Sequence, residues 1–207
     1  MNSKTERFSL PGPAGPIEAL RDLPEGVSRG TAVIAHPHPL FGGTMENKVV
    51  QTLARAFVQC GWTALRFNFR GVGATAGVHD EGRGETDDLL AVVASQAPEG
   101  PLALAGFSFG SFVASRALQS LWGTRSVEKV VLVGTAASRF DVATLPPQAH
   151  DCTLVIHGEM DDTVSLQSVL DWARPQSLPV TVIPGGEHFF HGQLPLLKNL
   201  VARHLRS

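Results

Sequence analysis

The sequence predicts an α/β fold with a mostly parallel central sheet and helices on both of its faces. Three observations lead to this prediction. From residue 31 onward, strand-like apolar runs alternate with helix-like segments, which is typical of βαβ crossovers. The runs, such as residues 130–133, are almost wholly apolar, as expected of strands buried on both faces. Finally, Gly-x-Ser-x-Gly at residues 106–110 stands between one such run and a helical segment.

The sequence of residues 7–20 predicts an antiparallel hairpin that precedes these crossovers. Two candidate strands, around residues 7–10 and 17–20, flank a turn rich in proline and glycine at residues 11–16.

The remaining elements follow from periodicity and from the residues that end them. Residues 47–59 carry Val50, Leu53 and Phe57 at helical spacing, and Gly61 then ends the helix. We expect strands at 31–35, 63–67, 102–105, 130–133, 154–156 and 180–183, and further helices at 85–96, 111–118, 166–172 and roughly 194–204.

Length and composition indicate one ordinary globular domain over residues 1–207. Hydrophobic residues make up 43% and charged residues 17% of the chain, which excludes a disordered polypeptide. The formal net charge is −2 and no basic run is present, so we expect neither a nucleic-acid nor a membrane partner. Oligomeric state is not readable, and a monomer or a homodimer fits equally.

Cysteine usage and the amino terminus favour a cytoplasmic protein. Cys60 and Cys152 have neither disulfide nor metal-site spacing. Residues 1–7 are polar and are not followed by the apolar stretch of a secretory signal. We expect no metal and no cofactor.

Ser108 is the candidate nucleophile. Strand, Gly-x-Ser-x-Gly and helix in succession are the context of a nucleophile elbow, a sharp turn that exposes the serine at a helix N-terminus. The glycines are needed for space, because side chains at those positions would collide with the strand and the helix.

A serine nucleophile needs a base and a group that orients the base, and the sequence offers both. His188 follows the predicted strand 180–183 in a glycine-containing loop; His191, its competitor, is expected to cap or pack at the start of the last helix. Asp161, Asp162 and Glu159 follow the strand at 154–156, and the residues alone separate them weakly. The carboxyl ends of parallel strands gather at one edge, so the serine, the histidine and an acid should meet there.

The chain resembles the α/β-hydrolase superfamily, and in particular small bacterial hydrolases of the lidless esterase, dienelactone-hydrolase-like kind. The resemblance covers nearly the whole chain and rests on five segments: residues 35–45, 66–73, 106–110, 157–161 and 186–190. It implies the α/β-hydrolase fold. It also implies that the acid is the Asp of a Gly-x-x-Asp pattern, which falls on Asp161.

Two further features of the site can be placed on the sequence. One oxyanion-hole N–H should come from Phe109, the residue after the nucleophile. The other should come from the loop after residue 36. The prolines at positions 37 and 39 have no N–H and are excluded. His38, Leu40 and Phe41 remain as donors, and we favour Leu40. Phe41 and Phe190 are expected to line an apolar acyl pocket.

Three other motifs are interpreted as structural. His36-Pro37-His38 lacks the companions of a metal site, and the glycines of residues 71–77 have the wrong spacing for a dinucleotide loop. The acidic residues of 82–88 fit the first turn of a helix, where the helix dipole favours them.

The sequence therefore predicts a serine hydrolase that cleaves carboxylic esters through an acyl-enzyme. Residues 139–151 are too few for a helical cap, so we expect an open site for short, soluble esters. A thioesterase, an acyltransferase or a small peptidase would use the same triad. A non-catalytic ligand-binding domain is the alternative of a different class.

Overall fold

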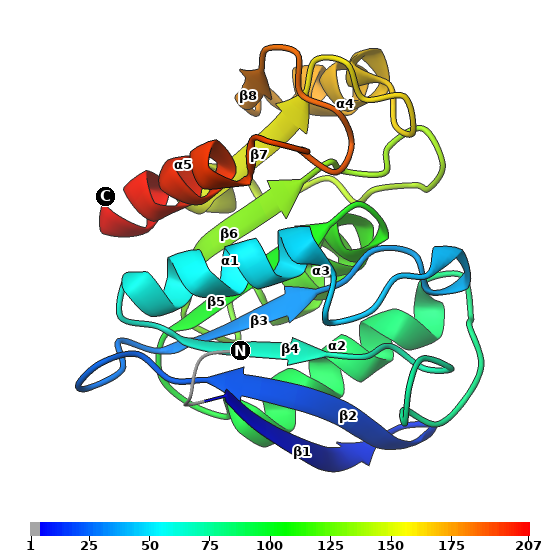
Figure 1. The fold of residues 1–207 in the computed structure, drawn as a ribbon, viewed down its shortest axis with the longest axis vertical. Helices are drawn as coiled ribbons and strands as arrows, with labels where there is room; N and C mark the ends of the chain where they lie inside the picture. Colours follow the sequence, from blue (N-terminus) through cyan, green and yellow to red (C-terminus); the bar gives the residue numbers. More distant parts are fainter. Residues whose placement is uncertain (1–4) are drawn as a thin grey trace.

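The computed structural model describes residues 5–207, and these form one eight-stranded sheet in the order β1-β2-β4-β3-β5-β6-β7-β8 (Figure 1). The strands are β1 (Thr5–Gly12), β2 (Gly15–Asp22), β3 (Thr31–Ala35), β4 (Thr63–Phe67), β5 (Leu102–Phe107), β6 (Val127–Val133), β7 (Thr153–Gly158) and β8 (Val180–Ile183). The α-helices are α1 (Lys48–Gln59), α2 (Arg83–Gln96), α3 (Phe109–Leu121), α4 (Leu166–Ala173) and α5 (Leu194–Arg206). Every element predicted from the sequence is present.

The sheet is antiparallel only at its amino-terminal edge. β1 and β2 form the predicted hairpin, and β2 pairs antiparallel with β4. All pairings from β4 through β3, β5, β6 and β7 to β8 are parallel. The carboxyl ends of β3, β5, β7 and β8 therefore open toward the same edge of the sheet.

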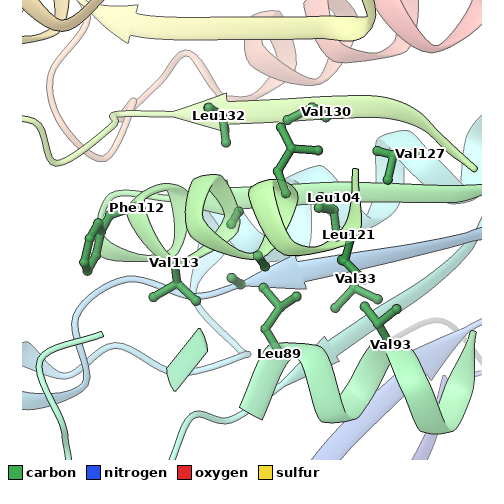
Figure 2. Close-up of a cluster of buried hydrophobic side chains, with 14 of the residues drawn as sticks. Val33, Leu89, Val93, Leu104, Phe112, Val113, Leu121, Val127, Val130 and Leu132 are labelled. Carbon is green, nitrogen blue, oxygen red and sulfur yellow. The ribbon is translucent and has the colours of Figure 1, made fainter. Parts of the chain in front are cut away.

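Helices cover both faces, because alternate residues of each parallel strand point to opposite sides. In β3, Val33 and Ala35 pack with residues of α2 and α3, whereas Ala32 and Ile34 pack with residues of α1 and α5. Figure 2 shows part of the first of these clusters, where side chains of α2 and α3 meet those of β3, β5 and β6. The doubly buried strands explain why the predicted runs lack polar alternation.

Side-chain hydrogen bonds fix the starts of two helices. The side chain of Asn47 accepts a hydrogen bond from the Val49 N–H at 2.8 Å, which caps α1. Glu85 is fully buried in the first turn of α2 and accepts the Gly82 N–H at 2.8 Å. The acidic start of α2 is therefore structural, as expected.

The segment between β6 and β7 holds only a short 3₁₀ helix, Pro147–Cys152, and no helical cap. The structure thus agrees with the expectation that no cap domain is inserted at this point. Within residues 5–207, no helix has the length and apolar character needed to span a bilayer.

Candidate active site

Ser108 occupies a strained turn between β5 and α3. Its φ of 57° and ψ of −117° fall in a region that side-chain-bearing residues rarely adopt. A Cβ on Gly106 would collide with the backbone of Gly110, and one on Gly110 would collide with the Ala35 carbonyl on β3. The turn therefore requires glycine at both positions, for the reason inferred from the sequence.

Hydrogen bonds fasten this turn to the neighbouring strand β6. The Ser108 N–H donates to the Val133 carbonyl at 2.8 Å. The buried hydroxyl of Ser111 lies 2.8 Å from the Gly106 carbonyl and accepts the Val133 N–H at 3.1 Å. The serine is thus presented by a rigid framework rather than by a mobile loop.

The structure brings Ser108, His188 and Asp161 together at the carboxyl ends of β5, β8 and β7. His188 Nε2 lies 3.1 Å from Ser108 Oγ, and His188 Nδ1 lies 2.7 Å from Asp161 Oδ2. All three residues are buried, with the serine 8% exposed. The array matches the geometry of a nucleophile, a base and an orienting acid.

The two other candidate acids, Glu159 and Asp162, do not contact His188. Glu159 accepts a hydrogen bond from the Gly185 N–H, and Asp162 faces the Thr163 hydroxyl at 3.3 Å. His191, expected at the start of the last helix, instead lies in the turn before α5. It is exposed and pairs with Glu187 at 3.2 Å, away from the serine.

Asp161 is held as a carboxylate within this array. Burial opposes its ionisation, but hydrogen bonds from His188 and from the Val164 N–H outweigh burial and lower its pKa below the ordinary value. Its Oδ1 also accepts the Thr163 N–H at 3.0 Å and the Val164 N–H at 2.7 Å. An ionised acid with a fixed orientation is suited to hold the His188 imidazole in one tautomer.

His157 is a second histidine beside this acid, and the sequence analysis gave it no role. Its Nε2 lies 2.9 Å from the Val164 carbonyl and 3.4 Å from Asp161 Oδ2. Because a carbonyl only accepts, this nitrogen carries the proton. Burial lowers the pKa of His157, and its Nε2–H donates to the Val164 carbonyl beside the acid. Its position four residues before Asp161 was the signal available in the sequence.

The loop after β3 does not favour Leu40 as the second oxyanion donor. The Leu40 N–H already donates to His38 Nδ1 at 3.2 Å, and the Phe41 N–H donates to the His38 carbonyl at 3.1 Å. Among residues 5–207, no group accepts a hydrogen bond from the N–H of His38 or of Phe109. Both residues line the cavity together with Ser108.

A cavity of about 390 Å³ opens over Ser108 and His188. Phe41 lines it, as expected, and is 82% exposed. Phe190 does not, so that prediction is wrong: its φ of 53° turns the ring into the core between the sheet, α1 and α5, where it is fully buried. The neighbouring Phe189 lines the cavity instead.

His36, directly after β3, has a structural role. His36 is fully buried; its Nε2 accepts the Phe69 N–H at 3.0 Å, and its Nδ1 lies 2.6 Å from the Pro37 carbonyl. Within the described chain, no three His, Cys, Asp or Glu side chains are grouped as metal ligands.

A larger hollow, of about 840 Å³, lies between β2 and α1. The buried ion pair of Arg66 and Asp22, 2.8 Å apart, forms part of its wall. None of the three residues of the serine array reaches it, so we assign the chemistry to the smaller cavity.

Comparison with known proteins agrees with this site. A family model described as alpha/beta hydrolase matches residues 72–165. A serine hydrolase of Xanthomonas campestris, described as a member without a lid, is 38% identical, with a TM-score of 0.88 over 100% of this chain and 95% of that chain. A serine hydrolase homologue of Coxiella burnetii is 37% identical, with a TM-score of 0.83 over 97% of each chain. An uncharacterized protein of Rickettsia prowazekii is 31% identical over 86% of this chain and 79% of its own length.

The chain belongs to the α/β-hydrolase superfamily. Its relatives place it among the α/β serine hydrolases, and the resemblance inferred from the sequence is thereby confirmed.

Proposed function

We propose that the protein is a carboxylesterase that cleaves short, soluble esters through Ser108, His188 and Asp161. The observation that carries this proposal is the placement of one imidazole between a strained serine and a buried carboxylate, at 3.1 and 2.7 Å. A serine hydroxyl becomes a useful nucleophile only beside such a base.

In the first half of the reaction, Ser108 Oγ attacks the ester carbonyl carbon while His188 Nε2 takes its proton. The tetrahedral intermediate collapses as the bond to the alcohol oxygen breaks. His188 returns the proton to that oxygen, and the alcohol leaves behind an acyl-serine. Asp161 stabilises the imidazolium that forms between these steps.

In the second half, water attacks the acyl-serine carbonyl and His188 takes one of its protons. The bond to Ser108 Oγ breaks, the serine regains its proton from His188, and the acid is released. No cofactor takes part in either half.

The N–H groups of Phe109 and His38 are the proposed oxyanion donors. Both stand next to the serine cavity, and neither is committed to another acceptor among the described residues. Free N–H groups fixed by backbone structure stabilise the charge of the intermediate without reorganisation.

The shape of the site supports short substrates. The cavity of about 390 Å³ is open to solvent, and no cap covers it between β6 and β7. Phe41 and Phe189 give it apolar walls that suit a small acyl group.

The decisive experiment measures hydrolysis of 4-nitrophenyl esters from acetate to palmitate by wild type, Ser108→Ala and the control Ser95→Ala, an exposed serine on α2. We expect turnover of the short esters that is lost in Ser108→Ala and kept in Ser95→Ala, with unchanged melting temperatures. Fluorophosphonate labelling should follow the same pattern.

Turnover that survives in Ser108→Ala would exclude this mechanism. A wild type that is labelled but leaves every ester intact would instead indicate a thioester or peptide substrate. A wild type that is neither labelled nor active would favour the ligand-binding alternative.

A further inference from the structure

One charged side chain on the wall of the serine cavity takes no part in the proposed chemistry. Arg139 lies in the turn that follows β6, and it lines the cavity together with Ser108 and His188. Among residues 5–207 it forms no ion pair with any carboxylate, not even with Asp141, two positions away in the sequence. Among the same residues its side chain donates one hydrogen bond, from Nε to the Thr163 carbonyl at 3.4 Å, which leaves both terminal nitrogens free.

The turn that carries Arg139 is held in place. The N–H groups of Arg139 and Phe140 both donate to the Ala136 carbonyl at 3.1 Å. The ring of Phe140 then stacks on Phe112 with centroids 4.8 Å apart and packs against Phe109 at 5.1 Å. Arg139 therefore projects from a fixed base at the cavity rim, although its side chain is solvent-exposed.

Within residues 5–207, no acidic side chain lines this cavity to balance the arginine. Asp161 lies behind His188 and is committed to it. Burial and the charges of His79 and Arg139 lower the pKa of the other cavity histidine, His38, against the opposite effect of Glu85. The wall thus carries one uncompensated positive charge in a chain whose net charge is −2.

Resting on the proposed esterase function, we propose that the substrate is an ester that bears a carboxylate, and that Arg139 binds this carboxylate. A guanidinium with two free nitrogens matches the two oxygens of a carboxylate. One isolated cation suits a monoanion, whereas a phosphate dianion usually meets several donors. The carboxylate can belong to the acyl half, as in a monoester of a dicarboxylic acid, or to the alcohol half, as in an ester of a hydroxybenzoate.

Two matched substrate pairs test the proposal and distinguish these halves. For the acyl half, the 4-nitrophenyl monoester of glutaric acid is compared with 4-nitrophenyl pentanoate, which has the same chain length but no charge. For the alcohol half, 4-acetoxybenzoate is compared with 4-methylphenyl acetate. The enzymes are wild type, Arg139→Gln, Arg139→Lys and the control Arg203→Gln, an exposed arginine on α5.

We expect Arg139→Gln to lower kcat/KM about tenfold for the charged member of one pair and to leave its neutral partner within about twofold. Arg139→Lys should retain part of the preference, and Arg203→Gln all of it. Added salt should weaken the preference in wild type, because the arginine is exposed. Equal effects on charged and neutral esters in both pairs would overturn the carboxylate assignment while leaving the esterase intact.

Failure of the esterase proposal itself would look different, because wild type would then hydrolyse neither neutral ester. Binding of monomethyl glutarate and of 4-acetoxybenzoate to Ser108→Ala, with and without Arg139→Gln, is measured by NMR titration in parallel. A dissociation constant about tenfold weaker without the arginine for one of these anions supports the anion site. Unchanged constants for both overturn it.

Discussion

Asp161 and His188 face each other across a distance of 2.7 Å, although they lie 27 positions apart in the chain. The carboxylate reaches the imidazole from the end of β7, and its other oxygen is anchored by two backbone N–H groups. The acid is thus fixed on one side by its own turn and aimed on the other at the base.

Replacing Asp161 by Asn should lower kcat about ten-thousandfold, because the amide no longer holds the imidazole in the tautomer that accepts the serine proton. The measurement is steady-state hydrolysis of 4-nitrophenyl acetate. Asp162→Asn serves as the matched control, since that exposed side chain accepts a hydrogen bond from Thr163 alone among the described residues, and it should stay within a few fold of wild type. A larger loss in Asp162→Asn than in Asp161→Asn would reverse the assignment of the acid.

Replacing Ser108 by Gly should stabilise the fold. The backbone at this position has a φ of 57°, which glycine adopts at little cost. Relief of this strain, reduced by the greater flexibility of glycine in the unfolded chain, should raise the free energy of unfolding by about 1 kcal/mol. Urea unfolding of Ser108→Gly and Ser108→Ala measures the effect. If alanine stabilises as much as glycine, backbone strain at the serine is not its origin.

The two adjacent phenylalanines after His188 should respond to truncation in opposite ways. Phe190→Ala should cost about 3–5 kcal/mol in the free energy of unfolding, because it leaves a cavity in the core. Phe189→Ala should cost less than about 1 kcal/mol and raise KM for butyrate esters, because its ring is 44% exposed and lines the substrate cavity. Chemical denaturation and kinetics of both variants test this division of roles.

Stability should fall as the pH drops from about 6.5 to about 4. Burial lowers the pKa of His36 to about 4, and burial together with Lys129 does so for His204. Between that value and the ordinary 6.5, the unfolded chain binds protons that the folded chain does not, so acid favours unfolding. Each histidine contributes a slope of at most about 1.4 kcal/mol per pH unit.

Unfolding free energies of wild type and His204→Gln at about pH 7 and about pH 5 measure this effect. Glutamine can still donate to the Cys152 carbonyl, which His204 contacts at 3.0 Å, but it does not titrate. The variant should lose less stability than wild type on acidification. An equal loss would show that His204 does not contribute to the acid sensitivity.

The fold was predictable because the central parallel strands β3, β4 and β5 are buried on both faces and the helices pack one face against the sheet. The pattern of apolar residues therefore indicates directly which segments are strands and which are helices. Within β3, Val33 packs with α2 and α3, and Ile34 packs with α1 and α5 on the other face. Ser108 and His188 were predictable for a related reason, since the carboxyl ends of parallel strands converge whatever the details of the loops.

Features that depend on loop conformation were not predictable. Phe189 and Phe190 are identical in type, and the backbone of the folded loop, with a positive φ at Phe190, places only the Phe189 ring at the cavity. Leu40 was favoured as a donor because the sequence does not reveal that His38 Nδ1 already accepts its N–H. Arg139 had no distinguishing pattern, because the lack of a carboxylate partner is a property of the assembled fold.

Ser108 and His188 lie 80 positions apart, and this separation has a consequence for the protein during its synthesis. The base belongs to the loop after β8, the outermost strand at the carboxyl-terminal edge of the sheet. A nascent chain emerges from the ribosome amino terminus first, so its serine is synthesised well before the histidine that would activate it. Under the proposed mechanism, a chain that ends before His188 lacks the base and cannot hydrolyse esters. Activity therefore arises only after the last strand and the loop that follows it have been synthesised and folded.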